Sequence, residues 1–341
     1  MDGYVPGEQP RSTNVIKLNT NENPYPPSPG VMEALRSIDS EMLRKYPDPV
    51  ASEIREKVAE LHNCNSDNVF VGNGSDEILA LCTRAFVEND GAIGYFDPSY
   101  SLYPVLSDIR DVRKIETPLA TGFGWNKPLT DGVSLFFLTN PNAPTSMLFE
   151  RDKVEQFCCD FDGVLLIDEA YVDFASDTLM DLALKYSNVL VMRTLSKSYS
   201  LAGLRVGYVV GDSDLIDALL KIKDSYNLDV VAQCLALAAL NDVEYMRANA
   251  SMIIATRERL IKELSDLGFC VSPSQTNFIW AVPPDGVNAA DLFEELKNAG
   301  ILIRYFPLAG IDRYVRITVG TDSEIDALLQ RVRQIVERGS K

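Results

Sequence analysis

Short, continuously apolar segments alternate with helix-like segments over much of the chain, and this pattern constrains the fold more than any other feature. The apolar segments are residues 69–71, 92–96, 133–138, 164–167, 189–192 and 206–210. Helical periodicity separates several of them, as at 77–87 and 151–161. Strands that are apolar throughout are buried on both faces, so the pattern predicts an α/β fold with a mostly parallel sheet covered by helices.

The two ends of the chain follow different patterns. Residues 1–27 lack periodicity and are expected to form an extended N-terminal arm, before a helix that begins at Ser28-Pro29. The C-terminal part contains strand-like segments at 277–282, 301–305 and 314–319, a helix at 289–298 and a final helix that opens with a Thr321–Glu324 capping box. We therefore expect a large domain at 28–245 and a smaller α+β domain at 246–341.

Composition excludes several classes of function. The net charge of −17 disfavours binding to nucleic acid or to an anionic membrane. No apolar run reaches membrane-spanning length, and no signal peptide is evident. The single histidine, His62, leaves too few ligands for a histidine-rich metal site, and it is better explained as the last residue of a helix. Six cysteines without C-x-x-C spacing indicate a reduced, cytoplasmic protein.

The segment 194–207 contains the side chains most suited to chemistry. It follows an apolar strand, and open α/β sheets bind ligands at the carboxyl ends of their strands. The hydroxyls of Thr194 and Ser196 and the guanidinium of Arg205 suit a phosphate. Lys197 lies among them, and it is either a surface lysine or a lysine that forms a Schiff base.

Two other strand ends carry candidate ligand-binding groups. Asp168 ends an apolar strand, where a carboxylate needs a partner such as a pyridinium N–H, unless it caps the next helix. Residues 72–77 join a strand to a helix, whose first N–H groups can bind phosphate. This loop has Glu77 where the dinucleotide fingerprint requires its third glycine, and Asp76 is unfavourable beside an anion.

The segment from Thr194 to Gly203, Thr-Leu-Ser-Lys-Ser-Tyr-Ser-Leu-Ala-Gly, resembles the lysine-site signature of class II aminotransferases that depend on pyridoxal phosphate (PLP). Segments 21–24, 74–77, 140–145 and 168–171 appear in the family's order and spacing. The resemblance covers essentially the whole chain and is closest to the histidinol-phosphate aminotransferases. It implies the aspartate-aminotransferase fold (PLP-dependent transferase fold type I), with a seven-stranded sheet in the large domain, and PLP as cofactor.

The resemblance assigns a role to each candidate residue. It implies that Lys197 carries PLP as a Schiff base and moves a proton at the substrate's α-carbon. Asp168 is expected to hold the pyridine nitrogen, Tyr171 the ring hydroxyl, and Tyr100 to stack on the ring. The phosphate ligands implied by the family are Ser75, Asp76, Thr194, Ser196 and Arg205.

The family also implies a homodimer with shared active sites. Tyr46 matches the residue that reaches the cofactor phosphate from the neighbouring subunit, and Tyr4 matches one that contacts the substrate from the partner. The chain departs from the family where Ala143 replaces the asparagine that usually bonds the ring hydroxyl. Either Asn142, one residue earlier, takes that role, or Tyr171 holds the hydroxyl alone.

Arg304 and Arg316 resemble the family's substrate-anion clamp. Each lies in an otherwise apolar strand, although a single such arginine is as readily explained by a side chain that extends from a sheet edge to water. The pair suits two small-molecule substrates, one ending in phosphate and one in carboxylate. The expected reaction is transamination between histidinol phosphate and 2-oxoglutarate, a step of histidine biosynthesis.

Three alternatives remain open from the sequence. An aromatic aminotransferase and a threonine-phosphate decarboxylase share the fold. A non-catalytic regulator on this fold is disfavoured, since it would need a DNA-binding module, and the chain has neither the spare length nor a basic patch.

Overall fold

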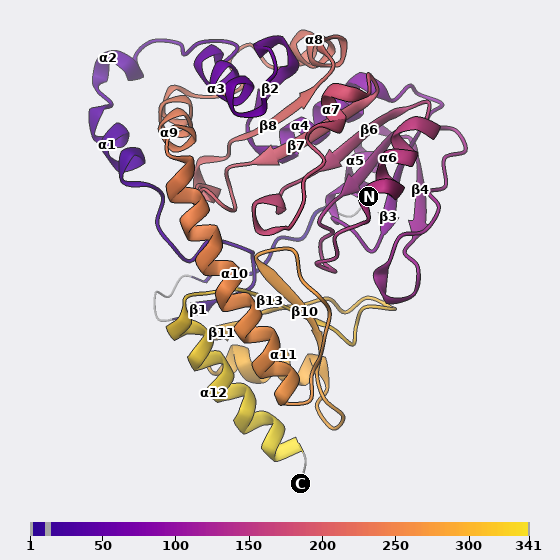
Figure 1. Ribbon diagram of the computed structural model, residues 1–341, viewed down its shortest axis with the longest axis vertical. Coiled ribbons are helices and arrows are strands. Elements are labelled where there is room, and N and C mark those ends of the chain that lie inside the picture. The colour runs from indigo at the N-terminus through magenta and orange to yellow at the C-terminus, as the bar shows by residue number, and fades with distance from the viewer. Residues whose placement is uncertain (1–2, 11–14, 340–341) are drawn as a thin grey trace.

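The computed structural model describes residues 3–10 and 15–339, and it has a larger and a smaller part joined by one long helix (Figure 1). Residues 1–2 and 11–14 of the expected arm, and residues 340–341 of the expected small domain, lie outside the described part. The larger part contains residues 29–240, and the smaller part contains the strand of the N-terminal arm together with the C-terminal strands and helices.

The larger part is built on a seven-stranded sheet, which confirms the predicted α/β class. The strands lie in the spatial order β2 (Val69–Gly72), β8 (Gly207–Gly211), β7 (Val189–Thr194), β6 (Val164–Asp168), β5 (Val133–Thr139), β3 (Ala92–Asp97) and β4 (Arg113–Pro118). Neighbouring strands are parallel except around β8, which runs antiparallel to both β2 and β7. Edge strand β4 is missing from the apolar segments of the sequence because most of its side chains are exposed.

Helices cover both faces of this sheet because its inner strands are apolar on both sides. Leu135 and Phe137 pack with one set of helices, while Phe136 and Leu138 pack with the other. The first set is α4 (Gly74–Phe86), α5 (Leu102–Arg110) and α8 (Ser213–Ile222). The second is α1 (Pro29–Ser37), α3 (Ser52–His62), α6 (Arg151–Asp160), α7 (Leu182–Lys185) and α9 (Val230–Leu240), and the short α2 (Ser40–Leu43) lies between α1 and α3 in the chain. None of the helices that the structure describes is long and apolar enough to cross a membrane.

The smaller part contains two sheets. Strands β12 (Arg304–Tyr305), β13 (Val315–Thr318), β10 (Phe278–Val282) and β9 (Cys270–Val271) form an antiparallel sheet in that order, and β1 (Ile16–Lys17) pairs in parallel with β11 (Ile301–Leu302). The prediction of one strand over 301–305 was therefore wrong. The segment divides at Ile303, because its first half pairs with the N-terminal arm and its second half pairs with β13.

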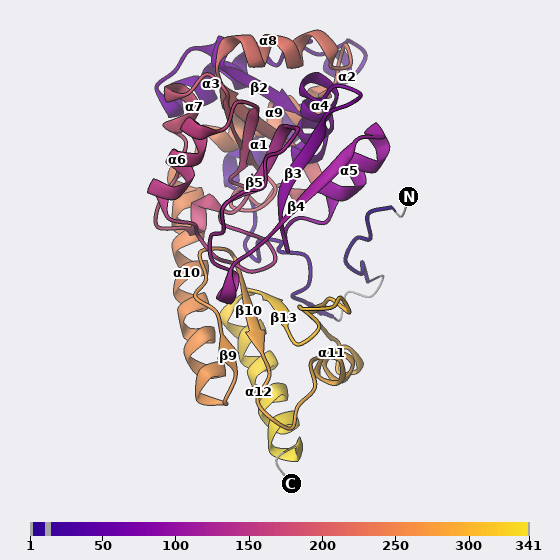
Figure 2. The same ribbon diagram turned by 90° about the vertical axis from the view of Figure 1, so that its right-hand side faces the viewer.

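Helix α10 (Val243–Asp266) runs along both parts and contacts α12 (Asp322–Gly339), which in turn contacts α11 (Ala289–Asn298) (Figures 1 and 2). Residues from the two parts meet in one apolar cluster that includes Tyr171, Met246 and Phe278. The domain boundary expected near residue 245 falls in the first turn of this helix, and it stays a prediction.

Candidate active site

A cavity of about 530 Å³ collects most of the predicted site residues. It lies where the carboxyl ends of β2, β3, β5, β6 and β7 meet the smaller part, as expected for a ligand site on an open α/β sheet. The predicted residues that line it are Tyr4, Ser75, Asp76, Tyr100, Asp168, Tyr171, Thr194, Ser196, Lys197, Arg205, Arg304 and Arg316. These residues come from segments far apart in the chain, and the fold brings them to one place.

Four side chains form a group of donors that we call the phosphate cradle: Ser75, Thr194, Ser196 and Arg205. The Thr194 hydroxyl donates to Ser196 Oγ over 3.0 Å, and Arg205 Nη1 donates to the same oxygen over 3.4 Å. Ser75 lies in the first turn of helix α4, and its buried hydroxyl has no hydrogen-bond partner among the described residues. Hydroxyls, a guanidinium and a helix N-terminus together suit a phosphate dianion.

Two glycines and one residue with a strained backbone allow the residues of the cradle to lie close together. A Cβ on Gly207 would lie 3.0 Å from Ser75 N, and a Cβ on Gly74 would lie 2.7 Å from Arg205 Nη2. Arg205 itself has a φ of 58°, in the left-handed region that side chains disfavour. Strain of this kind persists only where the surrounding structure holds it, and here it accompanies a guanidinium directed at the cradle.

The Asp76 carboxylate lines the cavity next to the phosphate cradle. Its Oδ1 accepts a hydrogen bond from Tyr100 Oη at 3.1 Å, and its Oδ2 pairs with Arg205 Nη2 at 3.2 Å. The carboxylate thus links the aromatic side of the cavity to the cradle. Burial, together with the nearby Asp76 charge, raises the pKa of Tyr100, so this hydroxyl stays protonated as a donor.

Asp168 is buried at the end of β6, with only 4% of its surface exposed. Its carboxylate accepts hydrogen bonds from Ala170 N at 3.0 Å and from Tyr103 Oη at 3.2 Å. Desolvation raises its pKa to about 6, against the lowering effect of these two donors. No basic side chain of the described residues pairs with it, so the carboxylate retains capacity for a cationic N–H donor from a ligand.

Lys197 lies partly buried in the loop after β7. Its Nζ has one long hydrogen bond, 3.5 Å to the carbonyl of Thr20, and lies 5.7 Å from the centroid of the Tyr171 ring. Burial, together with the nearby Arg316 charge, lowers its pKa to about 8. A lysine with a depressed pKa and few partners, inside a cavity, is suited to nucleophilic attack on a carbonyl.

Tyr171 has a partner that sequence reasoning did not single out. Asn21 Nδ2 donates to the Tyr171 hydroxyl over 2.9 Å, and Asn21 Oδ1 accepts from the hydroxyl of Thr318 in β13. Asn21 adopts a φ of 57° and is buried. Its presence in the family-like segment 21–24 was the only sign in the sequence. Through these two hydrogen bonds, Asn21 of the arm links Tyr171 of the larger part to Thr318 of the smaller part.

The two arginines line the cavity from the smaller part. Arg316 Nη2 donates to the carbonyl of Asn19, while its buried Nε has no partner among the described residues. Arg304 donates to the carbonyls of Val5 and Pro6. Neither guanidinium forms an ion pair with a described carboxylate, which leaves two positive charges for an anion from outside the chain.

Tyr4 lines the cavity in the single chain described, and the expectation that the partner subunit supplies it in a dimer stays a prediction. Its ring packs edge-on against Tyr100, with centroids 5.8 Å apart. Residues 3–10 of the arm also contact the smaller part. Arg304 binds arm carbonyls, and Lys297 pairs with Glu8 at 2.7 Å.

Two predicted residues do not lie on the cavity lining. Asn142 is buried, and its Oδ1 accepts from the Thr145 hydroxyl at 2.8 Å, so its side chain stabilises its own turn while Ala143 faces the cavity. Tyr46 is 80% exposed and stacks on Tyr226, with ring centroids 4.4 Å apart. Its expected role requires a second chain.

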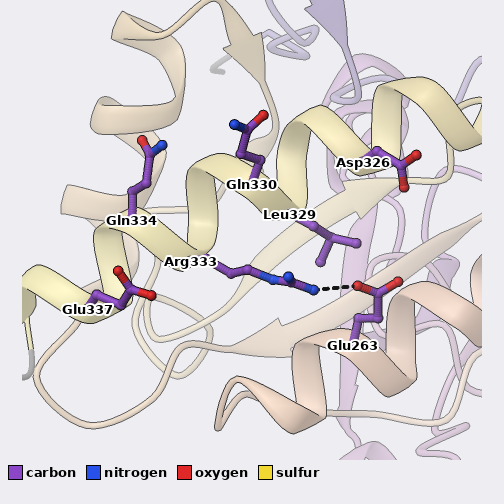
Figure 3. Close-up of a pocket in the computed structure, with 7 residues that line it drawn as sticks. All are labelled: Glu263, Asp326, Leu329, Gln330, Arg333, Gln334 and Glu337. Atoms are coloured by element: carbon purple, nitrogen blue, oxygen red, sulfur yellow. Dashed lines mark hydrogen bonds and ion pairs between the residues drawn. The ribbon is translucent and has the colours of Figure 1, made fainter.

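A second hollow of about 330 Å³ lies between α10 and α12 (Figure 3). Its lining is polar surface, in which Arg333 pairs with Glu263 at 2.8 Å across the two helices. It contains none of the predicted site residues. Among the residues that the structure describes, no group of histidine, cysteine and acidic side chains is arranged to hold a metal ion, here or elsewhere.

Comparisons with known proteins agree with this site. Residues 13–332 match the family "Aminotransferase class I and II". Histidinol-phosphate aminotransferase 1 of Nostoc sp. is 45% identical over 99% of this chain and 96% of its own length. The chain thus spans nearly the full length of this relative.

Solved structures share the fold. A histidinol-phosphate aminotransferase from Sinorhizobium meliloti, in complex with pyridoxal-5'-phosphate, superposes with a TM-score of 0.87 at 25% identity, over 95% of this chain and 91% of that one. Aspartate aminotransferase from Thermus thermophilus, at 18% identity, shares the fold with a TM-score of 0.82, over 94% of this chain and 91% of that one. The match over nearly the whole chain, together with this site, shows that the chain belongs to the class I and II aminotransferases.

Proposed function

We propose that this aminotransferase uses pyridoxal phosphate to transfer the amino group of histidinol phosphate to 2-oxoglutarate. One observation carries the proposal: a single cavity holds a lysine of lowered pKa, a buried carboxylate, a phosphate cradle and two arginines without described acidic partners. The name of the Nostoc relative supports the choice of substrate.

The donor set fits the cofactor in size and chemistry. The phosphate cradle would hold its phosphate, and the unpartnered Ser75 hydroxyl supplies one free donor. Asp168 would pair with the pyridine nitrogen, and Tyr100 would lie against the ring. Because Asn142 does not line the cavity, we assign the ring hydroxyl to Tyr171, which lines it and which Asn21 orients.

The chain's own groups then have defined tasks. Pyridoxal phosphate supplies an electron sink for the bond that breaks at the substrate's α-carbon. Asp168 keeps the ring nitrogen protonated, because a buried anion favours a cationic partner. Lys197 Nζ would hold the cofactor covalently in the resting enzyme, and its free amine would accept the proton from the α-carbon of the amino donor. Tyr171, near Nζ, helps to hold this amine in place.

Cofactor uptake provides a test of Lys197 through pH. We expect the cofactor-free protein to bind pyridoxal phosphate covalently at a rate that rises about tenfold per pH unit and levels off above pH 8, because the neutral amine is the nucleophile. Stopped-flow absorbance would measure the rate. A rate that keeps rising toward pH 10.5, the ordinary lysine pKa, would contradict the lowered value.

The substrate assignment rests on the two arginines and Tyr4. A phosphate carries more charge and more acceptor oxygens than a carboxylate, which one forked guanidinium can hold. Arg304, Arg316 and Tyr4 all line the cavity. Together they offer more hydrogen-bond donors than the single guanidinium that a carboxylate needs.

We expect histidinol phosphate to exceed phenylalanine and tyrosine as amino donor by at least roughly tenfold in kcat/KM, about 1.4 kcal/mol of transition-state binding. Arg304→Lys and Arg316→Lys should both lower this value, since an ammonium group lacks the planar fork. Tyr4→Phe should weaken the phosphorylated donor more than an unphosphorylated one. Steady-state assays against 2-oxoglutarate, with a panel of donors, would measure these effects.

Arg313→Lys is the matched control, because Arg313 is exposed outside the cavity and close in sequence to Arg316. A preference for aromatic amino acids would replace the proposed substrate with that of an aromatic aminotransferase. Release of carbon dioxide from threonine phosphate would indicate the decarboxylase. Neither result would change the fold or the family.

We further propose that the enzyme is a cytoplasmic homodimer in which Tyr46 reaches the cofactor phosphate of the neighbouring subunit. Two observations support it. Tyr46 is exposed and does not line the cavity of its own chain. All six cysteines are free, as expected for a protein in a reducing compartment. Sedimentation of the wild type tests the dimer. The cofactor affinity of Tyr46→Phe tests the contact with the phosphate of the neighbouring subunit's cofactor.

A further inference from the structure

We infer that Phe306 is a specificity-determining positioning residue, whose ring sets the spacing of Arg304 and Arg316 so that the pair binds a phosphate rather than a carboxylate. The inference rests on the proposed function, in which these arginines bind the substrate's anionic end. Phe306 lines the same cavity and is half-buried there.

The strand register places the three side chains together. Arg304 and Arg316 are directly opposite each other in the antiparallel pair β12–β13. Residues two apart along an extended chain face the same side, so Phe306 follows Arg304 on the arginine face, and Tyr305 faces away. Tyr305 accordingly packs on Phe293 of α11, with centroids 6.0 Å apart.

Both guanidinium groups lie over the Phe306 ring. The central carbon of Arg304 is 5.2 Å from the ring centroid, and that of Arg316 is 5.5 Å from it. Arg316 also lies 5.2 Å from the fully buried Phe278 ring, so two aromatic rings contact it, while Phe306 is the one ring found over Arg304 among the described residues. The one group common to both arginines is therefore Phe306.

This arrangement addresses an electrostatic problem. Like charges directly opposite each other on a sheet repel, and the Arg304 charge accordingly lowers the pKa of Arg316, in addition to the larger effect of burial. Neither arginine pairs with a described carboxylate that would hold it in place. The negative face of an aromatic ring attracts a guanidinium, so one ring stabilises both cations without neutralising the charge that an anion needs.

The ring is itself held in position. Trp280, the register partner of Arg316 in β10, packs against Phe306 with centroids 5.9 Å apart and stacks on Tyr314 at 4.9 Å. A supported ring fixes where the two guanidinium groups can lie. A phosphate can accept hydrogen bonds from both at once, whereas a carboxylate is satisfied by one fork. The fixed spacing should therefore matter more for the phosphate.

The test compares three variants of the holoenzyme. Phe306→Leu removes the ring but keeps apolar bulk, Phe306→Tyr keeps the ring, and Tyr305→Leu removes the neighbouring ring on the other face. We expect Phe306→Leu to raise KM for histidinol phosphate about tenfold, with KM for 2-oxoglutarate and kcat changed less than about threefold. Phe306→Tyr should keep both KM values near those of the wild type. Tyr305→Leu should not change one KM more than the other.

Inhibition by inorganic phosphate gives a second readout that needs no particular donor. The inhibition constant should rise about tenfold in Phe306→Leu and stay near wild type in the other two variants. An equal increase in KM for both substrates in Phe306→Leu would overturn the role of Phe306. So would a selective increase in KM for histidinol phosphate in Tyr305→Leu. If the wild type rejects histidinol phosphate but phosphate inhibition still follows the ring, the proposed substrate fails and the role of Phe306 stands.

Discussion

Lys197→Ala is expected to lower the transamination rate by at least about 10⁴-fold, the largest effect of any single change in the cavity. The substitution removes both the amine that forms the covalent link and the base that takes the α-carbon proton, and each such role is typically worth several orders of magnitude. The cavity should still bind the cofactor through the phosphate cradle and Asp168. Single-turnover kinetics and the visible absorbance of the purified protein would measure the loss.

Borohydride reduction provides the chemical counterpart of this test. In the wild type it should fix the cofactor to the peptide that contains Lys197, and in Lys197→Ala it should fix none. Lys17→Ala is a suitable control, because Lys17 is also partly buried but pairs with Glu22 and does not line the cavity. Peptide mapping that places the label on another lysine would show that the assignment is wrong.

Asp168→Asn is expected to lower kcat on the order of 10²–10³-fold while the fold and most cofactor binding are retained. The carboxamide has the same shape, and it can still accept hydrogen bonds from Ala170 N and the Tyr103 hydroxyl. It lacks the negative charge that keeps the pyridine nitrogen protonated. Measurements of kcat, cofactor affinity and thermal unfolding would separate the three properties.

Tyr103→Phe separates the charge of Asp168 from its hydrogen bonding. This variant keeps the carboxylate and removes one neutral donor, so its effect on kcat should stay below about tenfold. Transamination by Asp168→Asn at near wild-type speed, or a loss in Tyr103→Phe as large as that in Asp168→Asn, would defeat the electron-sink role of the carboxylate.

Much of the fold could be predicted because it depends on patterns along the chain. The inner strands are apolar on both faces, so β5 and β6 stand out from the sequence. Edge strand β4 carries Arg113, Lys114 and Glu116, and no apolar pattern marks it. The segment 301–305 was read as one strand because its division depends on two pairing partners, which lie hundreds of residues apart in the sequence.

The sequence by itself predicted the chemistry that we propose for the site. Lys197, Asp168 and the hydroxyls of the cradle lie in short segments at strand ends, where local pattern and motif suffice to find them. The tertiary structure alone decided that Asn21 orients Tyr171. It also decided that Phe306 lies under both arginines. These contacts join segments distant in sequence, and their geometry follows from how the two parts pack together.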